Sequence, residues 1–352
     1  MSLQYGDSLP ESVKWLICLL SKWKQILNYY HYQKRGFVPF VKKTFLLDKE
    51  IRAFIFLMRQ FAMTQGEAQR LIDRGRLLTG GRSMLDKAAW ISGEVEVVYF
   101  EPKGRGVKPI FANPDFALFE KESGVLVHPK TMQTPYSLLD EIRIYAGKDA
   151  NAVHRIDMET SGLLMASRNK SAERYLKNAF ESRKIEKSYL AWVDGEVENE
   201  FMVNAPLRVR DDYSESKHKV CVANNGKKAE TYFIPLEYDA MCDATLLACY
   251  PHTGRTHQIR VHLFHVKHPI LGDPIYGSSF QSANDYLEGE LSDEERMIEM
   301  GAPRLLLHAQ SLKFYYKSKF VLESKMDFRE MKNTICPKEK RRFNIQGRSH
   351  RP

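Results

Sequence analysis

Apolar residues recur at helical spacing near the start of the chain, between Pro10 and Gly36. The residues that share this face are Trp15, Leu16, Leu19, Trp23, Ile26 and Leu27. Such a stripe is typical of a helix that buries one face. We therefore expect residues 1–42 to form a helical extension packed on the protein itself. The same stripe also suits a partner protein or a membrane surface.

Residues 43–103 show the pattern of a small, separate α+β unit. Two helices are expected, and between them Thr64 and Glu67 are spaced as a capping box. Gly75 is suited to end the second helix in the left-handed conformation. A turn at 80–81 then leads into an alternating strand over 95–98. The inward positions of the helices are Phe54, Leu57, Met58, Phe61, Ala68, Leu71 and Ile72.

Residues 104–330 follow a linker at 103–106 and form a longer unit in which strand-like runs predominate. Strands are expected at 116–120, 162–166, 189–193, 230–236 and 245–250, and helices at 171–183 and 256–266. Residues 281–300 contain seven Asp or Glu and one Arg, which predicts a surface insertion. No internal repeat is visible, so an α+β fold is expected.

Charge and composition narrow the classes of function. The net charge is +9, and residues 331–352 alone carry +6, so this C-terminal segment is predicted to be a basic tail. A basic tail suits RNA, but solvated basic tails are also common. The five cysteines are scattered, which excludes a zinc knuckle or a disulfide framework. No apolar run is long enough to cross a bilayer and no signal peptide is visible, so we expect a cytoplasmic protein.

The segment 154–164, HRIDMETSGLL, places a compact polar run directly before an apolar strand. This arrangement holds a carboxylate, Asp157, at the mouth of a strand, with Arg155 as a neighbouring cation. A carboxylate in that position suits either catalysis or an ordinary turn. Spacing alone does not separate these two interpretations.

The segment 252–262, HTGRTHQIRVH, combines a tight turn with the start of a helix. Gly254 permits the turn, and Thr256 is expected to cap the helix. Arg255 and Arg260 are cations that suit a phosphate or a carboxylate, because a guanidinium binds either group with two parallel hydrogen bonds.

Five histidines fall between residues 252 and 268, but their spacing does not support a metal site. His257 and His262 are five residues apart rather than four, and no carboxylate stands between them as in the H-E-x-x-H pattern. His262 and His265 could share one helical face. We expect structural or RNA-facing histidines and no bound metal.

The ordered motifs resemble the RluA family of pseudouridine synthases from about Ile110 to Phe320. HRIDMETSGLL is similar to the family's signature around its nucleophilic aspartate, which falls on Asp157. KSYLAWVDG is similar to the segment of its active-site tyrosine, here Tyr189. HTGRTHQIRVHL, followed by HPILGDPIYG, is similar to the segment whose arginine pairs with the aspartate, here Arg260. LLLHA at 305–309 resembles a late strand of the family.

The N-terminal unit resembles the αL RNA-binding domain, first described in a ribosomal small-subunit protein and present in some RluA-family enzymes. Two segments depart from the usual patterns. Residues 78–80 read Leu-Thr-Gly where the αL domain usually has Val-Asn-Gly. Residues 121–122 read Lys-Glu where the RluA family usually has Lys-Pro.

The resemblance implies a long mixed, mainly antiparallel sheet with helices around it, and isomerisation of specific uridines in RNA to pseudouridine. Asp157 would be the nucleophile or stabilising carboxylate, and Arg260 would keep it ionised. Tyr189 would stack on the base and assist proton removal from carbon 5. Arg155 would fill the space of the flipped base or hold a phosphate. The reaction has no redox change, so no cofactor is expected.

The αL-like unit favours large-subunit ribosomal RNA as the substrate, with transfer RNA as the alternative. We expect a monomer that binds RNA and no membrane. The cations expected to contact RNA are Arg70, Arg74, Arg76, Arg82, Arg155 and Arg255. Two other classes stay open. One is a non-catalytic RNA-binding protein, and the other is a hydrolytic glycosidase, which needs a second carboxylate, such as Glu159.

Overall fold

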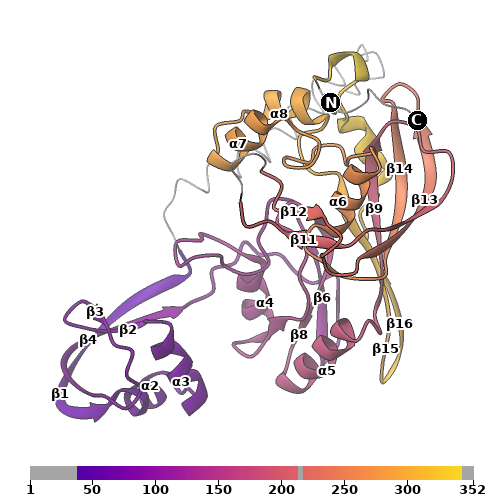
Figure 1. Ribbon diagram of the computed structural model, residues 1–352. Coiled ribbons are helices and arrows are strands. Elements are labelled where there is room, and N and C mark those ends of the chain that lie inside the picture. The colour runs from indigo at the N-terminus through magenta and orange to yellow at the C-terminus, as the bar shows by residue number, and fades with distance from the viewer. Residues whose placement is uncertain (1–37, 213–216, 343–352) are drawn as a thin grey trace, which may run out of the picture. The chain divides into compact units, whose positions relative to one another are not determined.

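The computed structural model describes residues 38–212 and 217–342 (Figure 1). Among these, residues 38–103 and 129–136 form one compact unit and the remainder forms a larger one. The helical stripe predicted between Pro10 and Gly36 lies outside the described residues, as does the end of the basic tail, residues 343–352. The described part of the chain contains no helix long and apolar enough to span a membrane.

The smaller unit is an antiparallel sheet with two helices, in the strand order β1-β4-β2-β3. Both predicted helices are present, and the strand expected over 95–98 is the middle of β4. The long strand β1 was not predicted, because most of its side chains are exposed and its polar residues do not alternate. The elements are β1 Phe40–Arg52, α2 Ala53–Phe61, α3 Gln65–Asp73, β2 Leu77–Thr79, β3 Arg82–Ser83 and β4 Trp90–Phe100.

Helix α3 begins and ends as its sequence predicts. The Thr64 side chain accepts from the Glu67 backbone N–H, and the Glu67 carboxylate accepts from the Thr64 backbone N–H. Gly75 follows with φ +64°, the left-handed region that favours glycine. Ala68, Leu71 and Ile72 are buried, as the helical spacing requires.

The larger unit is built on a ten-stranded sheet in the order β10-β13-β14-β9-β15-β8-β6-β5, with β16 on β15 and β7 on β8. Every pair of neighbours is antiparallel except β15 and β8. A mixed, mainly antiparallel sheet and the α+β class are therefore confirmed. The first elements are β5 Phe111–Ala112, β6 Phe116–Lys121, α4 Leu138–Ala146, β7 Asn151–Ala152, β8 Ser161–Ser167, α5 Lys170–Glu181, β9 Glu186–Asp194 and β10 Phe201–Asn204.

All five predicted strands and both predicted helices of this unit are found. Helices α4 and α5 lie on the β6–β8 half of the sheet, and α6 to α8 lie on the β9–β14 half (Figure 1). The remaining elements are β11 Leu207–Val209, β12 Val220–Val222, β13 Glu230–Asp239, β14 Ala244–Pro251, α6 Gln258–His265, α7 Phe280–Glu288, α8 Asp293–Met300, β15 Leu307–Tyr316, β16 Ser318–Glu323 and the 3₁₀ turns Arg329–Thr334 and Lys338–Lys340.

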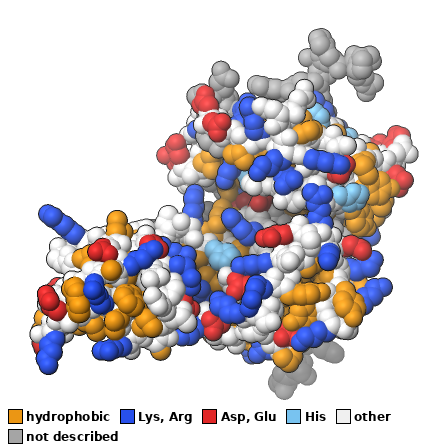
Figure 2. All heavy atoms as spheres, turned by 60° about the horizontal axis from the view of Figure 1, so that its bottom comes forward, with side chains coloured by type: hydrophobic (Ala, Val, Ile, Leu, Met, Phe, Trp, Pro, Cys, Tyr) orange, Lys and Arg blue, Asp and Glu red, His pale blue; other side chains and the backbone are white. Residues whose placement is uncertain are grey.

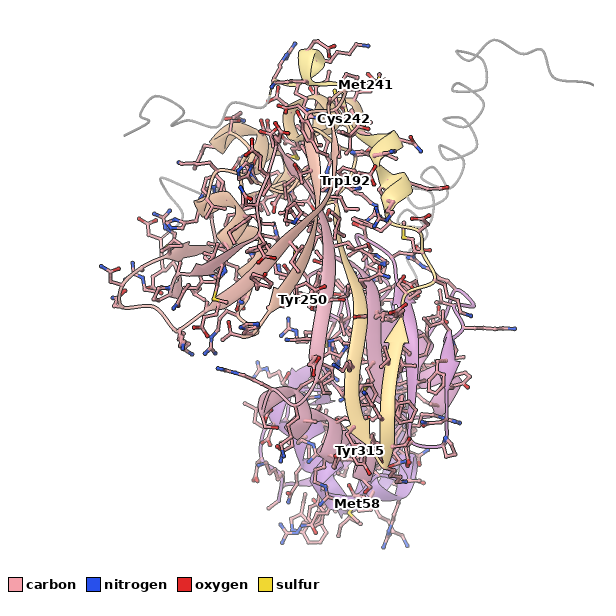
Figure 3. All side chains as sticks on the ribbon, turned by 90° about the vertical axis from the view of Figure 1, so that its right-hand side faces the viewer. Met58, Trp192, Met241, Cys242, Tyr250 and Tyr315 are labelled. Carbon is pink, nitrogen blue, oxygen red and sulfur yellow. The ribbon has the colours of Figure 1, made fainter. Side chains whose placement is uncertain are left out.

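Strand β9 joins two hydrophobic cores at the centre of the sheet. One core surrounds the fully buried Trp192, the other surrounds Phe116, and Tyr189 packs against both. Figure 3 shows Trp192 in the sheet, with Tyr250 on the neighbouring strand β14 and Tyr315 near the tip of the β15–β16 hairpin. The middle of β9 is therefore a rigid platform, because packed strands flank it on both sides.

Gly162 allows the only parallel contact among the described strands, between β8 and β15. It pairs with Ala309 and has φ +103°. A Cβ at this position would lie 2.4 Å from the Ala309 carbonyl oxygen, which no side chain tolerates. This close approach fixes the start of β8, which begins four residues after Asp157.

The acidic segment 281–300, predicted as a surface insertion, forms the helical pair α7 and α8. Most of its carboxylates are exposed, whereas Tyr286 and Arg296 turn toward the body of the unit. Ser292 and Glu295 form a capping box that starts α8. The pair is therefore an ordered element with one inward face.

The described part of the predicted basic tail packs on the larger unit. Ile335 and Cys336 are buried, and Arg341 forms a buried ion pair with Asp194 at 3.0 Å. The Arg341 guanidinium also donates to the Cys242 carbonyl, at the end of the sheet marked in Figure 3. This cation therefore serves the fold rather than a solvent-facing surface.

Buried His262 on α6 should make the unfolding free energy depend on pH. Its Nε2 donates to the Ala205 carbonyl and its Nδ1 accepts from the Thr231 hydroxyl. Burial lowers its pKa to about 4. The pKa of histidine in an unfolded chain is about 6.5. Between the folded and the unfolded pKa, the unfolded chain therefore binds more protons than the folded protein does. The stability contribution is therefore complete above the unfolded pKa and is lost as the pH falls toward 4.

Replacing His262 with Gln should reduce the slope of the unfolding free energy against pH in this window, by up to about 1.4 kcal/mol per pH unit. Urea unfolding at several pH values between the two pKa values measures this slope. The exposed neighbour His265, changed to Gln, is the matched control and should keep the wild-type slope. A wild-type slope in the His262 variant would contradict the assignment.

Candidate active site

Asp157 lies in the loop between β7 and β8, and backbone contacts hold that loop in place. Gly124 N–H donates to the Met158 carbonyl at 2.9 Å, and Thr160 N–H donates to the Asp157 carbonyl at 3.2 Å. The Asp157 side chain is 27% exposed. The carboxylate therefore reaches solvent from a fixed backbone.

The side chain of Lys121 also holds this loop in place. It is 1% exposed, and its Nζ donates to the carbonyls of Glu122, Val125 and Met158, each at 2.8 Å. Burial lowers the pKa of Lys121 to about 7, although the charges of Glu159 and Asp157 oppose that shift. Three carbonyl acceptors match the three N–H bonds of an ammonium group, so these contacts favour the charged form.

Arg260 on α6 lies between two carboxylates. Its Nη1 donates to Asp157 Oδ2 at 3.3 Å, and its Nε and Nη2 donate to the two oxygens of Asp273 at 2.7 Å each. Burial alone would lower the pKa of Arg260, but Asp273 and Asp157 outweigh burial and raise it above its ordinary value. The guanidinium therefore stays charged and presents one N–H edge to Asp157.

Asp273 was not singled out from the sequence. It is fully buried and also accepts from the backbone N–H groups of Ile275 and Tyr276, at 2.9 and 3.0 Å. Burial raises the pKa of Asp273, but Arg260 and these N–H groups outweigh burial and hold it below its usual value. In the sequence, Asp273 follows an apolar run and precedes a proline, and this pattern was the only signal that could have pointed to it. Nothing in the spacing links Asp273 to Arg260.

His257 also faces Asp157, which the sequence did not predict. Its Nε2 lies 3.8 Å from Asp157 Oδ2, and its Nδ1 bonds the Tyr276 hydroxyl at 2.9 Å. Burial lowers the pKa of His257 to about 4, and the nearby charge of Arg260 adds to this effect. The ring is therefore neutral at neutral pH, and Arg260 is the cation that faces Asp157.

The predicted cap at Thr256 is wrong. Helix α6 starts after His257, whose φ of +54° is left-handed, and Thr256 is exposed. The side chain of Gln258 takes over part of this role, since its Oε1 accepts from the Arg255 N–H and the Thr253 hydroxyl. The left-handed His257 at the N-cap forms no side-chain capping bond.

Tyr189 lies on β9, opposite Ala309 on one side and Cys249 on the other. Burial raises the pKa of its phenol above the ordinary value, and the charge of Asp157 adds to that effect. The phenol therefore stays protonated at neutral pH. It presents an aromatic ring with a hydroxyl that can act as a donor.

The larger unit also contains Arg155 and Arg255, the two other cations predicted to contact RNA there, and these two side chains share no hydrogen-bonding partner among the described residues. Arg155 is exposed on the loop of Asp157. Arg255 is half-buried, and its Nε donates to the Lys228 carbonyl at 3.0 Å. Figure 2 shows Lys and Arg side chains gathered around a hollow on one face of this unit. Such a face suits a polyanion.

In the smaller unit, Arg70 and Arg74 are exposed, one helical turn apart on α3 and at its end. Arg82 is exposed on β3. Arg76 is only half-exposed, and its guanidinium lies 4.5 Å from the Phe40 ring centroid. The first three therefore present free charge to solvent more fully than Arg76 does.

Several of the described histidines form hydrogen bonds within the fold. His154 is packed on Phe180 and accepts from the Met165 N–H at 3.0 Å, and His268 bonds the Asp194 carbonyl. Within residues 38–212 and 217–342, no group of three or more His, Cys, Asp or Glu has the arrangement of a metal site.

Comparison with known proteins agrees with the fold and the motifs. The family description "RNA pseudouridylate synthase" matches residues 115–265. An uncharacterized RNA pseudouridine synthase of Helicobacter pylori is 35% identical over 281 residues, which cover 80% of this chain and 93% of that protein. The chain belongs to the RluA family of RNA pseudouridine synthases, a family of isomerases.

Two other relatives carry substrate names. The ribosomal large subunit pseudouridine synthase D of Xanthomonas campestris is 30% identical and covers 72% of this chain and 73% of its own. The tRNA pseudouridine(31) synthase of Saccharomyces cerevisiae is 30% identical and covers 70% of this chain and 64% of its own. Among solved structures, human RNA Pseudouridylate Synthase Domain Containing 1 shares the fold, with a TM-score of 0.53 and 22% identity over 68% of this chain and 91% of that one.

Replacing Asp273 with Asn should strongly destabilise the larger unit. The change leaves the buried Arg260 without its closest counter-charge, a type of loss that costs about 3–5 kcal/mol. Chemical unfolding measures the difference, and the exposed Glu290, changed to Gln, provides the control. An Asp273→Asn variant as stable as this control would show that the pair contributes little to the fold.

Proposed function

We propose that this protein converts uridines of large-subunit ribosomal RNA to pseudouridine, with Asp157 as the nucleophile and without a cofactor. The observation that carries this proposal is the carboxylate of Asp157, partly exposed and 3.3 Å from a buried guanidinium that a second carboxylate anchors. A charged, oriented carboxylate at an open site suits covalent catalysis.

The proposed reaction rearranges bonds within one nucleotide. The bond from ribose C1′ to uracil N1 breaks, the uracil turns, and a bond from C1′ to C5 forms. C5 loses a proton and N1 gains one, so the product is an isomer and no electrons are exchanged. The protein must extrude the base, hold the detached uracil and stabilise charge at the sugar.

We assign three side chains to this reaction. Asp157 attacks the nucleotide, and Arg260 holds that carboxylate in position. The Tyr189 ring stacks on the uracil from the rigid strand β9. Its raised pKa makes the phenol a poor base, so the proposed role is stacking and hydrogen bonding rather than proton removal by a phenolate.

The burial of Glu159 favours isomerisation over hydrolysis. A hydrolytic glycosidase needs two available carboxylates beside the scissile bond. Glu159 is buried and bound by the Tyr286 hydroxyl and the Arg296 guanidinium, at 2.7 and 2.5 Å. Asp273 is likewise bound on both oxygens by Arg260. This leaves Asp157 as the exposed carboxylate of the group, which suits a single-carboxylate mechanism.

We propose that the smaller unit anchors the RNA through Arg70, Arg74 and Arg82, with Arg155 and Arg255 contacting the nucleotide's surroundings in the larger unit. An αL-like unit and a relative named for the large ribosomal subunit favour ribosomal RNA. The relative named for tRNA position 31 keeps transfer RNA as the alternative. We also propose that the protein acts as a monomer.

Asp157→Asn should abolish pseudouridine formation while folding and RNA binding persist. The amide keeps the size of the side chain but removes its charge and most of its nucleophilicity. Asp157→Glu should also fail, because the added methylene moves the carboxylate by about 1 Å. The assay is pseudouridine formed on total ribosomal RNA from a strain that lacks the gene. Asp149→Asn, outside the site, is the control.

Retention of more than a small fraction of wild-type turnover in Asp157→Asn would contradict the proposed nucleophile. Transfer RNA from the same strain, tested in parallel, decides between the two substrates. Pseudouridine formed on transfer RNA alone would reassign the substrate and leave the chemistry intact.

Changing Arg70, Arg74 and Arg82 together to Gln should weaken RNA binding and its dependence on salt. Each lost phosphate contact lowers the slope of log K against log salt by about 0.9 on duplex RNA or about 0.7 on a single strand. Filter binding at several salt concentrations measures this slope. Lys43 and Lys49, exposed on β1 and changed to Gln, are the control. An unchanged slope in the triple variant would show that RNA binds elsewhere.

A further inference from the structure

Glu159, two residues after Asp157, is held by side chains from the acidic insertion. Tyr286 on α7 donates its hydroxyl to Glu159 Oε1 at 2.7 Å. Arg296 on α8 donates to Glu159 Oε2 at 2.5 Å. The Glu159 and Arg296 side chains are largely buried, and the Arg296 guanidinium lies 5.0 Å from the Tyr286 ring centroid. The only basic residue in this acidic segment is thus directed at the catalytic loop.

Arg296 also contacts the loop that carries Asp273. The same Nη2 atom lies 3.3 Å from the carbonyl of Gly272, the residue before Asp273. Asp273 holds Arg260, and Arg260 holds Asp157. The contacts therefore close a ring that runs from Asp157 through Arg260 and Asp273 to Arg296, and back through Glu159.

The electrostatics of the ring support charged partners throughout. Burial raises the pKa of Glu159, but Arg296 and the Tyr286 hydroxyl outweigh burial and hold it below its ordinary value. Burial lowers the pKa of Arg296, and the charge of Glu159 reverses that effect. A buried ion pair of this kind has little freedom, because displacing either partner leaves an unpaired charge in a dry environment.

We propose that the α7–α8 pair is a positioning element for catalysis, in which Arg296 and Tyr286 fix Glu159 and thereby the Asp157 carboxylate relative to Arg260. The inference rests on the proposed role of Asp157. It assigns the acidic insertion a function beyond covering the surface. Arg296 and Tyr286 are positioning residues, since neither contacts Asp157 directly.

Tyr286→Phe is the most selective test, because it removes one hydroxyl and keeps the aromatic ring. Arg296→Met removes both contacts of the guanidinium, and Arg296→Lys keeps the charge with fewer donors. Glu294→Gln, an exposed change on the same helix α8, is the matched control. Each variant is measured as the full-length chain for kcat and KM on ribosomal RNA, for RNA affinity and for thermal stability.

We expect Tyr286→Phe and Arg296→Met to lower kcat by about tenfold to 100-fold, since a carboxylate misplaced by about 1 Å has an effect of that order. RNA affinity and KM should change by less than about twofold, because the lost interaction acts on the catalytic step. Arg296→Lys should recover part of the lost kcat. The Glu294→Gln control should match the wild type in every measurement.

A double-mutant cycle with Glu159→Gln tests the route of the effect. If Arg296 acts through Glu159, adding Arg296→Met to Glu159→Gln should lower kcat far less than it does alone. Additive losses would contradict the proposed route. Wild-type kcat in both Tyr286→Phe and Arg296→Met would overturn the positioning role, as would losses of kcat that follow loss of folded protein.

If Arg296→Met fails to fold, Tyr286→Phe alone decides, since it leaves the buried ion pair in place. These outcomes are separate from a failure of the proposed function. An active wild type with normal insertion variants contradicts only the positioning role. An active Asp157→Asn variant contradicts the assignment of the nucleophile itself.

Discussion

The buried guanidinium of Arg260 is the interaction on which the site depends. It lies on α6, between a buried carboxylate that holds it with two hydrogen bonds and a partly exposed one that it holds with a single bond. Burying an arginine requires such compensation, because an unpaired charge in the interior is strongly unfavourable. The asymmetry of the two pairs leaves Asp157 oriented yet accessible, which nucleophilic catalysis requires.

The rest of the larger unit keeps this arrangement rigid. Lys121 and the parallel contact at Gly162 hold the loop of Asp157 at Met158 and at the start of β8, and β9 sets Tyr189 between two packed cores. The cations that we propose to bind phosphate, by contrast, are distributed over exposed positions such as Arg155. The proposal thus assigns affinity and chemistry to different residues, as expected when RNA is held mainly through its backbone.

Periodicity and short motifs predicted much of the fold, because the helices and strands bury regular faces and the three assigned site residues stand in ordered motifs. They did not predict Asp273 as the anchor of Arg260, or the contact of Arg296 with Glu159, since both depend on how distant loops meet. Strand β1 was missed because its polar residues do not alternate, and Thr256 was wrongly expected to cap α6 because a left-handed His257 starts that helix. The contacts of Asp273 and Arg296 are tertiary, and the local sequence pattern carries no record of them.

We propose that a uridine in RNA is isomerised without leaving the chain. The most direct measurement uses ribosomal RNA from a strain lacking the gene, labelled with tritium at uracil carbon 5 and incubated with the wild-type protein. If the protein isomerises uridine, tritium is released to water in equal amount to the pseudouridine found in the digested RNA, with no free uracil. Binding without tritium release, or uracil released from the RNA, would contradict it.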